Sequence, residues 1–181
     1  MTDLLCAPPP VASPDPGAVS RDLMELVLKP YLPDCRYMKG AFARCVDTAA
    51  PSLVLEADFR IPSSCYIDST GHFNAVESNI CVNQMSYLLF AWFVQEPRRH
   101  AFSPTVGAFD LSTFRQKQLP NMWILSLQTS FRKAINAHHF RGRLEWTGSR
   151  RLASLLLLNM SFEFSDDARG RAAGSVQFAV T

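Results

Sequence analysis

The sequence lacks the cysteine spacing of a zinc site or a disulfide framework. Its five cysteines form no C-x-x-C pair and are odd in number, whereas such sites use paired, regularly spaced cysteines. No other metal-ligand spacing stands out, and we expect neither a bound metal nor a cofactor. The cysteines therefore predict reduced thiols in a cytoplasmic protein.

The sequence also lacks an excess of charge of one sign and a secretory signal. It has 18 basic and 16 acidic residues, so the clustered basic face of a nucleic-acid-binding protein is not expected. No basic region followed by an apolar run opens the chain. The apolar segment 75–94 has the length of a membrane span, but it contains Glu77, Asn79, Asn83 and Gln84. Such polar content favours a core helix and no membrane span.

A nucleophile in an activating context is missing as well. The G-x-S-x-G motif of a serine hydrolase does not occur. Cys65 and Cys81 have no activating neighbour in the sequence, and turn or capping roles explain Ser69 and Thr70 better. The residues therefore give poor support to nucleophilic catalysis.

What is present is enough apolar material for one core. The chain has 181 residues, of which 48% are hydrophobic and 11% aromatic, which suits one domain. Residues 1–18 are rich in proline and poor in large apolar groups, and they predict a disordered or extended tail. We expect a single domain over residues 19–181.

The periodicity of the apolar residues predicts an α+β domain. Ser20 is placed to cap a short helix to Leu28, a long and almost wholly apolar helix covers 75–95, and a short helix lies near 111–118. Strands are predicted at about 36–46, 53–61, 122–132, 140–147, 152–164 and 174–180.

A helix that is apolar on all sides must be wrapped by other structure. A curved, mostly antiparallel sheet of about six strands around that helix satisfies the pattern, and this is the hot-dog fold. Domains of this kind commonly pair as homodimers, which also covers their edge strands.

The most informative segment is the turn 69–77, which leads directly into the long helix. Its imidazole, His72, lies beside the backbone N–H groups that open a helix and have no partner within it. Imidazole can move protons near neutral pH, and the N–H groups can hold a carbonyl oxygen. The alternative is that His72 only bonds a loop carbonyl.

Other polar residues around this turn also have two interpretations. Asn74 and Glu77 have the spacing of a capping box, or they contact a ligand. Asn83 shares a helix face with Asn79 and either pairs with a strand backbone or a dimer partner or points into an acyl-thioester cleft. Tyr66, and more weakly Tyr31 and Tyr37, offer O–H donors that could polarise a carbonyl.

Three motifs carry a resemblance to a known family. They are Ser69-Thr-Gly-His-Phe-Asn-Ala-Val-Glu77 followed by Cys81-Val-Asn-Gln84, Ser130-Phe-Arg-Lys133 with Asn136, and Lys29-Pro-Tyr31 with Cys35-Arg-Tyr37. Over about residues 20–180 the chain resembles the FcoT-like hot-dog family of mycobacterial long-chain fatty acyl-CoA thioesterases. The resemblance implies that Tyr31, Tyr66, Asn74 and Asn83 line an acyl-thioester site without an evident nucleophile or carboxylate base.

The resemblance also implies a reaction. Close relatives in actinomycete pathways to isonitrile lipopeptides and β-amino acyl units add glycine to the β-carbon of an α,β-unsaturated acyl thioester. The expected substrates are glycine and a fatty acyl thioester on acyl carrier protein or coenzyme A. The alternatives are a long-chain fatty acyl-CoA thioesterase and a non-catalytic acyl-binding module.

In such an addition His72 would act as base and then as acid, and Tyr66, Asn74 or the helix N-terminus would hold the enolate oxygen. We expect Tyr31, Asn83 and Glu77 to contact substrate. A cation is wanted for the glycine carboxylate, and the candidates are Arg36, Arg115, Arg132 and Lys133.

Overall fold

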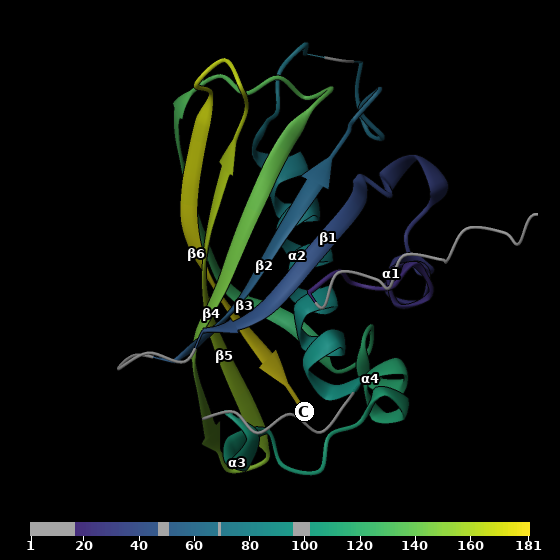
Figure 1. The fold of residues 1–181 in the computed structure, drawn as a ribbon, viewed down its shortest axis with the longest axis vertical. Coiled ribbons are helices and arrows are strands. Elements are labelled where there is room, and N and C mark those ends of the chain that lie inside the picture. Colours follow the sequence, from purple (N-terminus) through teal and green to yellow (C-terminus); the bar gives the residue numbers. More distant parts are fainter. Residues whose placement is uncertain (1–16, 47–50, 69, 96–101) are drawn as a thin grey trace, which may run out of the picture.

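The sheet of this protein has six strands, each antiparallel to its neighbours. A computed structural model describes residues 17–46, 51–68, 70–95 and 102–181 (Figure 1). The sheet order is β1-β2-β4-β5-β6-β3. The strands are β1 (Met38–Val46), β2 (Ser52–Phe59), β3 (Met122–Lys133), β4 (Phe140–Leu152), β5 (Leu155–Ser165) and β6 (Arg171–Val180).

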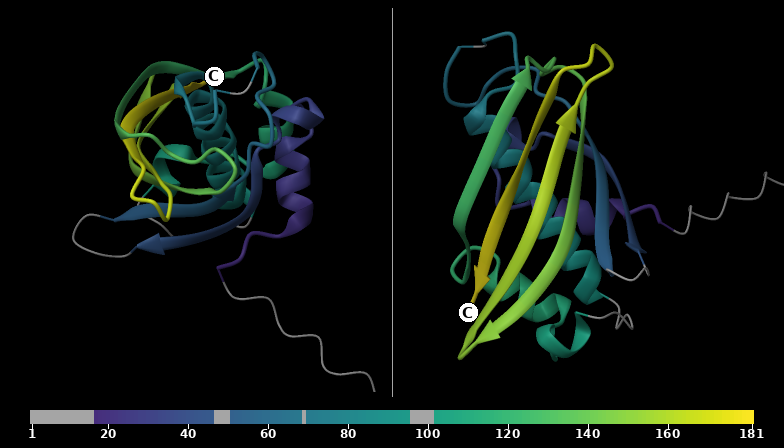
Figure 2. Two further views of the ribbon diagram at one scale, coloured as in Figure 1. Left: turned by 90° about the horizontal axis from the view of Figure 1, so that it is seen from above. Right: turned by 90° about the vertical axis from the view of Figure 1, so that its left-hand side faces the viewer.

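The sheet curls around the long helix α2 (Ala75–Gln95), as Figure 2 shows in the view along that helix. Every residue from Gln84 to Val94 is buried. The predicted α+β arrangement, a buried central helix wrapped by a curved antiparallel sheet, is therefore confirmed. None of the helices in the described part of the chain combines the length and apolar character that crossing a membrane requires.

Short helices cover the side of α2 that the sheet leaves open. α1 (Arg21–Leu28) and α4 (Leu111–Lys117) both pack against α2. The predicted cap of α1 is confirmed, because Ser20 Oγ accepts a hydrogen bond from Leu23 N at 3.3 Å. A one-turn helix, α3 (Ser103–Val106), and a 3₁₀ turn at Pro33–Cys35 were not predicted.

Three predicted strand boundaries were wrong, and one of them is the start of β6, which begins at Arg171 and not at about 174. β4 continues to Leu152 and β5 starts at Leu155, so the pair forms a long hairpin that turns at Ala153 with a φ of 55°. Its end includes the exposed Arg150 and Arg151, which carry none of the apolar alternation that marks a half-buried strand. The predicted tail 1–18 lies outside the described residues apart from Gly17 and Ala18.

An aromatic cluster fixes the end of the sheet that lies beside the start of α2. The ring of Phe73 lies 4.5 Å from that of Phe140 and 4.9 Å from that of Phe164, and Phe59 stacks on Phe140 at 5.2 Å. Phe73 N also donates to Ile135 O at 2.9 Å. The turn that carries His72 is therefore anchored in the core by the residue that follows it.

Candidate active site

The start of α2 is closed by the predicted capping box. Asn74 Oδ1 accepts hydrogen bonds from Val76 N at 3.0 Å and Glu77 N at 3.2 Å, and Glu77 Oε2 accepts from Asn74 N at 3.2 Å. The carboxylate of Glu77 is buried in this reciprocal arrangement. The capping interpretation of both residues is therefore confirmed, and most of the free N–H groups expected at this helix end are occupied.

One atom of the Asn74 side-chain amide lacks a hydrogen-bond partner among the described residues. Tyr66 donates its O–H to Asn74 Oδ1 at 2.7 Å, so this oxygen accepts three hydrogen bonds. The nitrogen Nδ2 is buried and has no hydrogen-bond acceptor among the described residues. An unpaired buried donor costs about 1–3 kcal/mol. The Tyr66 proton is therefore used to orient Asn74, and the Asn74 amide nitrogen is the donor left over.

His72 lies on an exposed turn, with its ring held by its own loop. Nδ1 lies 3.1 Å from Thr70 O, and Thr70 Oγ1 donates to His72 O at 2.9 Å. A carbonyl oxygen can only accept, so the ring nitrogen facing it carries the proton. In the neutral ring Nε2 is then the unprotonated nitrogen. The predicted contact with a loop carbonyl is present, and it prepares the other nitrogen to act as a base.

The second motif of the sequence lies beside this turn. The rings of Phe131 and Phe73 are 6.1 Å apart, so the end of β3 packs next to the His72 turn. Arg132 is exposed there. Lys133 Nζ donates to Ala168 O at 2.6 Å, which holds this ammonium group at the β5–β6 turn.

The third motif places Tyr31 against the middle of α2. Burial raises the pKa of Tyr31, with smaller contributions from Tyr87 and Cys81, so its hydroxyl stays protonated and can donate. Arg36 Nε donates to Tyr31 O at 2.9 Å, and Arg36 Nη2 donates to Lys29 O at 3.1 Å. The guanidinium of Arg36 therefore secures the chain around Tyr31, a role that the sequence did not reveal.

Asn79 and Asn83 pair with each other on a partly exposed face of α2. Asn83 Nδ2 donates to Asn79 Oδ1 at 3.3 Å, a pairing within the helix that was not predicted. The neighbouring Gln84 is buried and structural, because it accepts from Met38 N at 3.1 Å and donates to Cys35 O.

Neither Cys35 nor Cys81 is a thiolate that could serve as a nucleophile. Burial and a hydrogen bond to the Cys65 side chain raise the pKa of Cys35 to about 11. Burial, and then the charge of Glu77, raises the pKa of Cys81 well above its usual range. Both thiols are therefore protonated at neutral pH.

Sequence reasoning missed two supports of the site. Phe73 anchors the turn in the aromatic cluster, and Tyr37 Oη accepts from Cys65 N at 3.4 Å, which fixes the residue before Tyr66. Tyr37 belongs to a motif that the resemblance had already marked. The signal was present, but its partner lies 28 residues away in the chain.

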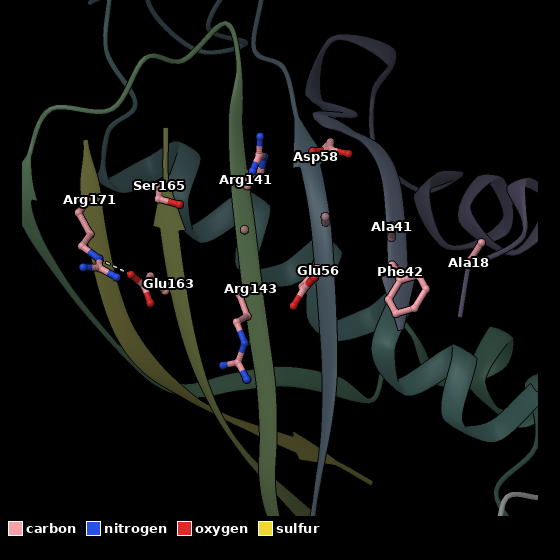
Figure 3. A pocket seen from close by; sticks show the side chains of 12 residues that line it. Ala18, Ala41, Phe42, Glu56, Asp58, Arg141, Arg143, Glu163, Ser165 and Arg171 are labelled. Carbon is pink, nitrogen blue, oxygen red and sulfur yellow. Dashed lines mark hydrogen bonds and ion pairs between the residues drawn. The ribbon is translucent and has the colours of Figure 1, made fainter. Parts of the chain in front are cut away.

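A groove of about 590 Å³ lies on the opposite face of the sheet (Figure 3). Its charged lining has both signs, with Arg143 and Arg171 beside Glu56 and Glu163. Arg171 pairs with Glu163, and Arg143 pairs with Glu145 at 2.7 Å. No described residue of the His72 turn lines this groove.

Comparisons with known proteins agree on the family. The FcoT-like thioesterase domain matches residues 26–180. A (2E)-enoyl-[ACP] glycyltransferase from Streptomyces coeruleorubidus is 35% identical over 162 residues, which cover 87% of this chain and 94% of that protein. The protein of the same name from Mycobacterium marinum is 35% identical over 173 residues, covering 93% and 90%.

A solved structure agrees with the fold. The Lactococcus lactis protein yhdA, described as a candidate thioesterase, superposes with a TM-score of 0.54 at 7% identity, covering 80% of this chain and 94% of that one. With its family match over most of its length and its two relatives at 35% identity, this chain belongs to the FcoT-like thioesterase family.

Proposed function

We propose that this protein adds glycine, through its nitrogen, to the β-carbon of an α,β-unsaturated fatty acyl thioester carried on an acyl carrier protein. The observation that carries the proposal is the His72 turn, where an imidazole with Nε2 free for a proton precedes by two residues an amide whose Nδ2 has no acceptor among the described residues. The names of the two relatives at 35% identity support the same substrates.

The reaction assigns one task to each group. His72 Nε2 removes a proton from the glycine ammonium, and the amine forms a bond to the β-carbon while the double-bond electrons move onto the thioester oxygen. Asn74 Nδ2 donates to that enolate oxygen and gains the acceptor that it lacks. The imidazolium then returns a proton to the α-carbon, so no leaving group forms and the thioester remains intact.

The helix N-terminus has a smaller part than the sequence suggested. Its N–H groups at Val76 and Glu77 are bound by Asn74, and the N–H of Asn74 is bound by Glu77. The Asn74 amide nitrogen therefore replaces them as the main donor. Tyr66 acts through Asn74 as a positioning residue.

Arg132 is the first choice for the glycine carboxylate. It is exposed at the end of β3, beside the packed rings of Phe131 and Phe73. Arg36 and Lys133 already donate to backbone carbonyls, so using either for glycine would cost existing hydrogen bonds.

We also propose a homodimer that closes the site. β3 is an edge strand of the sheet and exposes Trp123, Leu125 and Phe131, a combination that invites pairing with a second copy. Asn83 and the exposed Val76 lie on the partly exposed face of α2. A second copy would cover part of this face. A cytoplasmic location remains a prediction of the sequence.

The deciding experiment mixes the protein with an enoyl thioester and glycine and follows the products by mass spectrometry. The proposal expects an intact thioester that is heavier by one glycine, and no such product with His72→Ala. Free acid without adduct contradicts the proposal and favours the thioesterase. Acyl binding without any turnover favours the non-catalytic module.

A further inference from the structure

Four cations gather on two neighbouring segments next to the site. Lys29, Arg36 and Lys39 lie in the chain from the end of α1 into β1, and Arg60 follows β2. Arg36 Nη2 donates to Lys29 O, and Lys39 Nζ donates to Arg36 O at 2.8 Å. Arg60 N donates to Tyr37 O at 3.0 Å, which brings the second segment against the first. We call these four residues the cationic rim.

The cationic rim has no ion-pair partner in the part of the chain that the structure describes. Within residues 17–46, 51–68, 70–95 and 102–181, none of the four forms an ion pair with an acidic side chain. Two acidic residues lie close to them in the chain: Asp34, between Lys29 and Arg36, and Asp58, which pairs with Gly40 across β1 and β2 and precedes Arg60 by two residues. By contrast, Arg44, Arg143 and Arg171 on the outer face of the sheet each pair with a glutamate.

The cationic rim also borders the residues of the site. Arg36 Nε holds the carbonyl of Tyr31. Tyr37, which lies between Arg36 and Lys39, accepts from the N–H of Cys65, the residue before Tyr66. A partner bound at this rim would therefore lie beside both site tyrosines.

We propose that the cationic rim is the docking surface for an acidic acyl carrier protein that presents the enoyl thioester to the His72 turn. The inference rests on the proposed function for the identity of the substrate. Unpaired cations attract an acidic partner over a distance of about 10 Å at 0.1 M salt and speed its encounter more than they tighten the final complex. The phosphates of coenzyme A are anionic as well, so the test below must separate the carrier protein from coenzyme A.

The test reverses the charge of the rim without changing the catalytic residues. Lys39→Glu and Arg60→Glu are compared with Arg150→Glu, which makes the same charge change on an exposed residue near the far end of β4 (Figure 1). Thermal unfolding first establishes that all three variants are folded. Binding of an acidic holo-carrier protein is then measured without turnover, at low and at high salt.

We expect each rim variant to weaken carrier binding about tenfold at low salt, with a smaller loss at high salt, and Arg150→Glu to stay within about twofold of the parent. Equal weakening in all three variants, or none in the rim variants, overturns the docking surface. Because binding needs no reaction, this result stands apart from a failure to detect the glycine adduct.

A kinetic comparison separates the carrier from its phosphate groups. For rim variants, kcat/KM should fall with the carrier-bound enoyl thioester and stay unchanged with the same acyl group on N-acetylcysteamine. An equal fall with the coenzyme A thioester would show that the rim binds phosphate and would overturn carrier docking.

Discussion

The two halves of α2 differ in what surrounds them. From Gln84 to Val94 every side chain is buried between the curved sheet and the short helices. The first turns instead have exposed positions at Val76 and Asn79 and an end closed by hydrogen bonds from side chains. Apolar packing stabilises the C-terminal half of α2, and hydrogen bonds between side chains and backbone stabilise its first turn. The chemistry is expected at the first turns, where the wrapping stops and substrate can reach the helix end.

His72→Ala gives the largest expected effect at the polar end. Loss of the base should lower the rate of glycine addition by about 10²–10⁴-fold. The side chain is exposed and its only described hydrogen bond is to Thr70 O, so thermal unfolding should change little. Single-turnover kinetics followed by mass spectrometry measures the rate, and a variant within threefold of the parent would remove His72 from the mechanism.

Leu88→Ala tests the wrapped half. This side chain is 1% exposed, and its truncation should lower the free energy of unfolding by about 2–5 kcal/mol through lost burial and a new cavity. Urea titration followed by circular dichroism measures the loss. The fraction that stays folded should retain the parent's KM for the thioester, whereas a changed KM would show that the two halves are coupled.

Asn74→Ala should reveal both roles of the capping residue. The lost cap should cost about 1 kcal/mol of stability, and the lost donor to the enolate should lower kcat by about 10²-fold. Tyr66→Phe is the matched control, because it removes the hydrogen bond to Asn74 Oδ1 and leaves the cap bonds in place. A loss of stability in Asn74→Ala with normal kcat would leave only the capping role.

Asp166 gives the smallest expected effect, in the segment that packs beside the His72 turn. Its carboxylate accepts from Asn136 N at 2.7 Å and Gly170 N at 2.6 Å, and the first of these bonds is the main cause that lowers the pKa of Asp166. A lowered pKa means that its stabilisation is present above the unfolded pKa of about 4 and is lost as the pH falls through the folded value. Unfolding curves of the parent and Asp166→Asn should therefore differ at pH 7 and converge at acidic pH, and a constant difference would contradict this assignment.

The elements and the cap could be predicted from the sequence because their signals are local. Apolar residues around the whole circumference of 75–95 predicted a wrapped helix, and an asparagine three residues before a glutamate predicted the capping box. The end of the β4–β5 hairpin escaped detection because Arg150 and Arg151 continue a strand without apolar alternation.

Which hydrogen bonds and packing contacts each site residue makes could not be predicted from the sequence in the same way. Tyr66 donates to Asn74, Phe73 packs on strands that follow it by more than sixty residues, and Arg36 holds the carbonyl of Tyr31. Each of these contacts depends on how the chain folds back. The sequence named the site residues as candidates, and the structure decides which of their polar atoms are already in use.

The central claim is that the polar end of α2 directs an enoyl thioester to addition and not to hydrolysis. The most direct measurement is one time course with ¹³C-labelled glycine that quantifies the labelled thioester adduct and the free acid together. The account predicts that labelled adduct accumulates with the thioester intact and that little free acid forms. Release of free acid at the same rate with and without glycine, with no labelled adduct, would contradict it.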